Sequence, residues 1–129
     1  MKPPTDYLFA YGLLLDEAPA AELLVLFGTA THVGRATALG VMYDAGAYPA
    51  AVEGDGVLHG KVIGFPSAAA LAILDKYEGV DHQPPLYNRG RTVATLDDGR
   101  KLDCWIYRYA RDTSKLRRID SGRWGEQPK

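Results

Sequence analysis

Apolar and polar positions alternate most clearly in the second half of the chain. The segment Tyr87–Leu96 alternates, and Asp97-Asp98-Gly99 separates it from the segment Lys101–Tyr109. Alternation predicts a strand, and Asp-Gly between two strand-like runs predicts a tight turn. We therefore expect a β-hairpin here, followed by a polar and irregular tail over Ala110–Lys129.

Helical spacing replaces alternation just before this hairpin. Residues Leu71, Leu74 and Tyr77 recur at the period of one helix face, so the pattern predicts a helix over Ala68–Tyr77 that packs on a sheet. Gly79 is a natural stop for this helix. A shorter apolar helix is expected at Ala20–Phe27.

The first half of the chain has a different texture. Tyr7–Leu14 is dense in aliphatic and aromatic residues and predicts a strand, although Gly12 interrupts it. A glycine inside a strand indicates a bulge, a bend, or the close approach of another backbone or a ligand. From Gly28 to Val62 glycine recurs often, which predicts short strands in a sheet that bends strongly or closes.

Composition narrows the class of protein. The 129 residues fit a single domain over 1–129, and 47% hydrophobic residues suffice for a core. The net charge of −1 does not indicate a nucleic-acid partner, and no apolar run is long enough for a bilayer. We expect a cytoplasmic protein without membrane attachment. Cys104, the one cysteine, is expected to pack as a small hydrophobe, and no cluster has metal-ligand spacing.

Glu78 is the one carboxylate whose position suggests chemistry. It follows the predicted helix, where the negative end of the helix dipole opposes its charged form. Burial would raise its pKa further, toward the range that suits proton transfer. From these features alone, a solvated residue at a helix end is the favoured interpretation.

Several short motifs, taken in order, resemble the gamma-glutamylcyclotransferase-like family, which includes AIG2-like and bacterial members. Their order and spacing match from about residue 7 to about residue 124. The motifs are Leu8-Phe9-Ala10-Tyr11-Gly12-Leu13-Leu14, Ala47-Tyr48-Pro49-Ala50, Gly56–Gly60, Leu74-Asp75-Lys76-Tyr77-Glu78-Gly79, Tyr87-Asn88-Arg89 and Ser121-Gly122-Arg123-Trp124. The resemblance implies an α+β fold, a small mixed and partly closed β-barrel with flanking helices. It also implies an enzyme without metal or cofactor that converts a gamma-glutamyl amine into 5-oxoproline and the free amine.

The same resemblance implies the residues of the site. Glu78 corresponds to the family's glutamate and would be the catalytic general acid and base. The backbone of the segment Tyr11, Gly12, Leu13 and Leu14 would donate N–H groups to the substrate. Tyr48 and Tyr107 would line the substrate pocket, although a plain core role is the alternative for both.

Two further residues have structural expectations. Arg89 lies in a matched motif, and its alternative role is a structural ion pair with a nearby carboxylate. Trp124 is expected to anchor the C-terminal segment by packing.

The chain departs from the family pattern in its substrate loop. Leu13 stands where Ser or Thr is usual, and the acidic Asp16 and Glu17 follow where a basic residue is common. An acidic loop favours a small-molecule gamma-glutamyl substrate with a cationic leaving amine. The alternatives are a non-catalytic module of the same fold that binds a small ligand, and a scaffold with a vestigial pocket. A monomer or a weak homodimer is expected.

Overall fold

The computed structural model describes residues 6–11, 30–46, 48–77, 80 and 83–124. Its elements follow in the order β1 (Asp6–Ala10), β2 (Thr31–Asp44), β3 (Pro49–Phe65), α2 (Ala69–Tyr77), β4 (Tyr87–Leu96), β5 (Lys101–Tyr109) and β6 (Arg117–Ile119). Within these ranges no helix has the length and apolar character needed to cross a membrane. The predicted helix Ala20–Phe27 lies outside the described residues.

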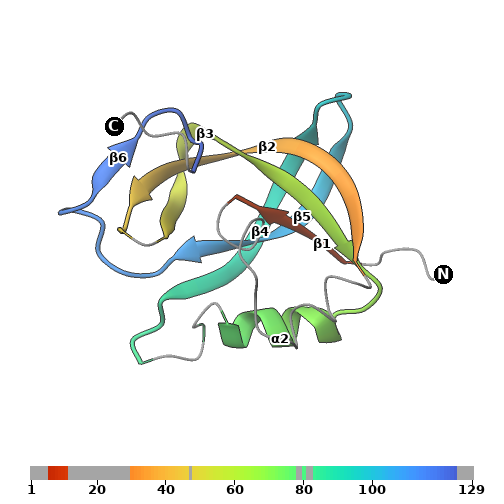
Figure 1. The fold of residues 1–129 in the computed structure, drawn as a ribbon, viewed down its shortest axis with the longest axis horizontal. Helices are drawn as coiled ribbons and strands as arrows, with labels where there is room; N and C mark the ends of the chain where they lie inside the picture. The colour runs from red at the N-terminus through yellow and green to blue at the C-terminus, as the bar shows by residue number, and fades with distance from the viewer. Residues whose placement is uncertain (1–5, 12–29, 47, 78–79, 81–82, 125–129) are drawn as a thin grey trace.

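Five of the strands form a closed ring (Figure 1). The order is β3-β1-β5-β4-β2, and the pairing of β2 with β3 closes it, while β6 extends the sheet from β2. The β1–β5 pair is parallel, with Leu8 opposite Trp105, and the other pairs are antiparallel. The predicted α+β fold with a mixed, partly closed barrel is therefore confirmed.

The hairpin and the long helix were predicted with nearly their observed bounds. Strands β4 and β5 pair from Tyr87 opposite Tyr109 to Thr95 opposite Lys101. The turn places Gly99 at a φ of +93°, a conformation that glycine adopts without steric cost. Helix α2 buries Leu71 and Leu74, as its apolar spacing requires.

The prediction of short strands over Gly28–Val62 is wrong. This region holds the two longest strands, β2 with 14 residues and β3 with 17. The glycines do not end these strands, because the pairing of β2 with β3 continues past each irregularity. The register shifts between His32 and Gly34 and again between Leu39 and Val41. Strongly bent strands let one long hairpin wrap around the barrel.

Two smaller boundary predictions also need correction. The first strand ends at Ala10, whereas Tyr7–Leu14 was predicted, and Tyr11 already lies beyond it. The tail over Ala110–Lys129 is not wholly irregular, since β6 pairs Ile119 with Met42 and buries the isoleucine. A strand of three residues between charged neighbours carries too little alternation to be recognised.

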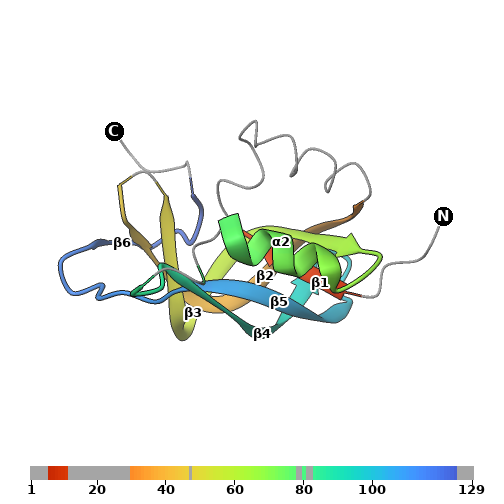
Figure 2. The ribbon, with the colours of Figure 1, turned by 90° about the horizontal axis from the view of Figure 1, so that it is seen from below.

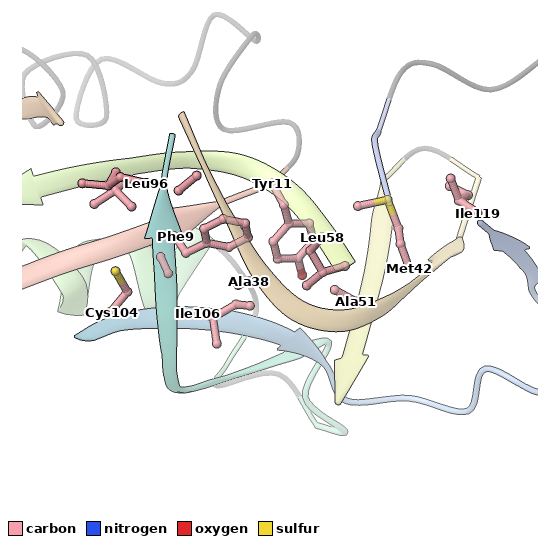
Figure 3. Packing of buried hydrophobic residues seen from close by; sticks show 13 residues of the cluster. Phe9, Tyr11, Ala38, Met42, Ala51, Leu58, Leu96, Cys104, Ile106 and Ile119 are labelled. Atoms are coloured by element: carbon pink, nitrogen blue, oxygen red, sulfur yellow. The ribbon is translucent and has the colours of Figure 1, made fainter. Parts of the chain in front are cut away.

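The apolar side chains form two cores on opposite sides of the sheet. One fills the barrel, where Phe9, Tyr11, Leu58 and Ile106 converge (Figure 3). The other lies between the outside of the barrel and α2, which packs against one face of the sheet (Figure 2). Trp124 is packed against the barrel core, so the prediction that it anchors the C-terminal segment is confirmed.

Candidate functional site

Tyr11 lies at the point where the chain leaves β1. Its ring is buried inside the barrel at 7% exposure and stacks on Phe9, with 6.4 Å between ring centroids. Its hydroxyl donates a hydrogen bond to the backbone carbonyl of Tyr107 on β5. This bond fixes Tyr11, which follows β1 and directly precedes Gly12, to the neighbouring strand β5.

Tyr107 joins the same point of β5 to helix α2. Its side chain is buried on the helix side of the sheet, at 3% exposure. The hydroxyl donates to Oδ1 of Asp75 at 2.7 Å, and the Leu71 carbonyl lies farther away at 3.4 Å. A hydrogen bond to a charged acceptor stabilises by about 1.5–3 kcal/mol, so this contact holds the last turn of α2 on the barrel.

Asp75 also accepts from Arg89 on β4. The Arg89 Nε lies 2.9 Å from Asp75 Oδ1, and both side chains are 25% exposed. The Arg89 guanidinium stacks on the ring of Trp105 at 4.4 Å, and Arg91 does the same. Arg89 thus makes the structural ion pair that the sequence offered as its alternative role.

A backbone hydrogen bond joins Val80 to the last turn of α2. The Val80 N–H donates to the carbonyl of Asp75, five residues earlier, at 3.1 Å. A bond of this span is typical of a helix that ends in a tight reversal. Asp75 therefore takes part in both the side-chain network and the backbone closure at this helix end.

Tyr48 belongs to a cluster of three aromatic rings at the start of β3. Its ring centroid lies 6.2 Å from that of Tyr87 and 6.5 Å from that of Tyr109, and those two rings are 5.8 Å apart. The Tyr87 hydroxyl donates to the Pro49 carbonyl, which ties β4 to the first residue of β3. Tyr48 and Tyr107 contribute to the same core on the α2 side.

The structure thus joins Tyr11 to Tyr107 by a hydrogen bond and places Tyr48 in the same core as Tyr107, which reaches the end of α2 through Asp75. Four predicted site residues, Gly12, Leu13, Leu14 and Glu78, lie outside the described residues, so their roles remain predictions. Sequence reasoning missed Asp75 as a contact residue. Its place in the Leu-Asp-x-x-Glu-Gly motif, one helical turn before Glu78, was the available signal.

Cys104 is fully buried in the barrel core, as predicted (Figure 3). Burial raises the pKa of its thiol to about 11, so the thiol stays protonated near neutral pH and is a poor nucleophile. Across the described ranges, no three His, Cys, Asp or Glu side chains gather as a metal site would require.

Known proteins are similar to this chain in sequence and in fold. Residues 8–126 match the family model described as gamma-glutamyl cyclotransferase, AIG2-like. The gamma-glutamylcyclotransferase family protein YtfP of Escherichia coli K12 is 35% identical over 89 residues, which are 68% of this chain and 70% of that protein.

Solved structures extend the likeness to the fold. The solution structure of Escherichia coli YtfP superposes with a TM-score of 0.65 and 28% identity, and covers 93% of this chain and 96% of that chain. A crystal structure of a mouse AIG2-like protein has a TM-score of 0.67 at 20% identity, over 89% of this chain and 86% of that chain. The barrel with its helix on one face is therefore the fold of these proteins.

Proposed function

The chain belongs to the gamma-glutamyl cyclotransferase, AIG2-like family, and on this premise we propose that it converts a gamma-glutamyl amine into 5-oxoproline and the free amine. The substrate's own α-amine attacks its γ-carbonyl carbon, which forms the five-membered lactam. The bond from that carbon to the leaving nitrogen then breaks. Because the nucleophile is intramolecular, positioning of the substrate supplies much of the rate.

Proton transfer completes the reaction. We assign it to Glu78, which takes a proton from the attacking amine and returns one to the departing amine. N–H groups in the segment Gly12–Leu14 stabilise the negative charge that develops on the γ-carbonyl oxygen. We assign Tyr48 and Tyr107 to the wall of the substrate pocket.

One observation in the fold supports this assignment most directly. Tyr107 accepts a hydrogen bond at its carbonyl from Tyr11 and donates one from its hydroxyl to Asp75. Tyr11 directly precedes Gly12, and Asp75 precedes Glu78 by three residues. The two chain segments that carry the proposed chemistry therefore start from neighbouring points around one buried tyrosine.

The leaving amine is the part of the substrate that we assign from charge. Asp16 and Glu17 follow the proposed substrate loop and would repel a second carboxylate. We propose a cationic leaving group, such as lysine linked through a side-chain nitrogen or a polyamine. Faster turnover of anionic gamma-glutamyl amino acids would contradict this assignment.

The test is 5-oxoproline release from a panel of neutral, cationic and anionic gamma-glutamyl amines. Glu78→Gln keeps the shape of the side chain and removes its proton-transfer capacity, so we expect turnover to fall by at least about 100-fold. Asp97→Asn, which alters an exposed carboxylate at the β4–β5 turn, is the matched control and should retain turnover. Absence of turnover by the unmodified chain on every amine would favour the non-catalytic binding module instead.

A further inference from the structure

A depression lies between the start of β3 and the open end of the β4–β5 hairpin. It has a volume of about 430 Å³, within the range of small-molecule sites. Residues of β3, β4 and β5 line it, and Figure 1 shows how these three strands are arranged. Its lining includes Val52 and Glu53 from β3, Asn88 and Gly90 from β4, and Arg108 and Tyr109 from β5.

Arg108 is one of the two arginines that line this depression. Its side chain is only 21% exposed, and its Nη2 donates to the carbonyl of Arg91 at 3.1 Å. Its Nη1 lies 3.9 Å from Oε1 of Glu53, which is too long for a hydrogen bond. A guanidinium has five N–H donors, so much of its capacity within the described residues is open to a ligand.

Gly90 makes room for this guanidinium. A Cβ atom built on Gly90 would lie 2.7 Å from Arg108 Nη1 and 3.9 Å from its Cζ. The guanidinium therefore rests against the bare backbone of β4, where a side chain would push it away. The glycine keeps the positive charge low in the depression rather than in bulk solvent.

The depression is lined by two arginines and one glutamate, and only one of the arginines has a close ion-pair partner. Arg89 also lines it, but Asp75 neutralises that guanidinium at 2.9 Å. The remaining charges are the positive Arg108 and the negative Glu53, whose side chain is 83% exposed. A simple anion would be repelled by Glu53 and a simple cation by Arg108, whereas a ligand with adjacent opposite charges satisfies both.

We propose that this depression binds the zwitterionic end of an α-amino acid, with its carboxylate on Arg108 and its ammonium group on Glu53. An α-amino acid carries these two charges on one carbon, which suits groups only 3.9 Å apart. Arginine binds carboxylates through paired N–H donors. Val52 and Tyr109 line the same space and supply apolar surface for the rest of the ligand.

The ligand has two possible sources, a free amino acid or the amino-acid end of a gamma-linked amide. Titration of the full chain with L-alanine or L-glutamine, followed by ¹H–¹⁵N spectra, distinguishes them. We expect saturable shifts of the Asn88, Gly90 and Tyr109 backbone amides. Shifts with both probes indicate recognition of the zwitterion alone, and shifts with L-glutamine alone indicate the amide source. If neither probe gives saturable shifts at these amides, the proposal is wrong.

Variants separate charge recognition from a change in fold. We expect Arg108→Gln to weaken L-alanine binding by about tenfold, because it removes a charged hydrogen-bonding partner. Glu53→Gln should weaken L-alanine binding by about threefold, because the ammonium group loses its partner, and should strengthen acetate binding, because acetate only loses a repulsion. Opposite effects on two ligands cannot come from a damaged fold.

Two further variants complete the test. Gly90→Ala displaces the guanidinium and should weaken L-alanine binding while the spectrum remains that of the folded protein. Arg117→Gln, which alters an arginine paired with Asp44 on another strand, should leave the affinity unchanged. Acetate binding as tight as L-alanine binding, and insensitive to Glu53→Gln, would show a plain carboxylate site and overturn the proposal. Because no turnover is measured, this result is independent of the proposed reaction.

Discussion

Among the turn glycines in the part of the chain that the structure describes, Gly122 is predicted to lose the most stability on replacement by alanine. Gly122 has a φ of +67°, where an L-residue is strained by about 1 kcal/mol. An added Cβ would lie only 1.8 Å from the Val57 carbonyl oxygen, so the backbone must move. The Gly122 carbonyl accepts from the His59 N–H at 2.9 Å, and this bond would weaken.

These contributions can be added. Strain costs about 1 kcal/mol, the weakened hydrogen bond about 1 kcal/mol, and the forced displacement of packed backbone about 1–2 kcal/mol. We therefore expect Gly122→Ala to lower the free energy of unfolding by about 3–4 kcal/mol. Trp124 follows two residues later, so its packing against the barrel core should loosen too.

The control is Gly99→Ala. Gly99 also has a positive φ, at +93°, but an added Cβ would meet no atom within 4 Å. This variant carries backbone strain without the collision, so a loss of about 1 kcal/mol is expected. Urea unfolding of both variants, followed by tryptophan fluorescence, measures the difference. Equal losses would refute the reasoning, because the close approach to Val57 would then have no cost.

Two other predictions follow from the buried side chains. Tyr107→Phe should lower the free energy of unfolding by about 1.5 kcal/mol and reduce 5-oxoproline release, because Asp75 loses its hydroxyl donor. Tyr43→Phe, on β2, is the control. If both variants have equal effects on urea unfolding and on turnover, the role of the Asp75 contact is contradicted. Burial raises the pKa of the Cys104 thiol from 9.0 to about 11, so the folded state holds this proton more tightly than the unfolded state does. This contribution to the stability of the folded state is complete below pH 9.0 and is lost as the pH rises toward 11. The unfolding free energy of the unmodified chain should therefore fall by about 2 kcal/mol more than that of Cys104→Ala between about pH 8 and about pH 10.5, and parallel pH profiles would contradict it.

Local signals explain which elements could be predicted from the sequence. The β4–β5 hairpin is marked by alternating apolar positions and by the turn residues Asp98-Gly99. Helix α2 is marked by the helical spacing of Leu71 and Leu74. The long strands β2 and β3 were missed because their glycines look like turn residues. Their bends are set by pairing across the barrel, which no short window of sequence contains.

The candidate site was predictable only in part, for a similar reason. Resemblance to the family selected Tyr11, Tyr48 and Tyr107, but it did not indicate how they are connected. Tyr11 and Tyr107 are 96 positions apart, and their bond depends on the parallel pairing of β1 with β5. The partner of Asp75 is likewise set by packing of α2 on the barrel.

That parallel pairing also has a consequence for biosynthesis. Strand β1 leaves the ribosome early, but one of its two edges is covered only when β5 has been made, almost a whole chain later. Until then the nascent chain exposes an unpaired apolar edge, which is open to association with other chains. Barrel closure is therefore a late event, and a chain truncated before Lys101 cannot assemble the site around Tyr107.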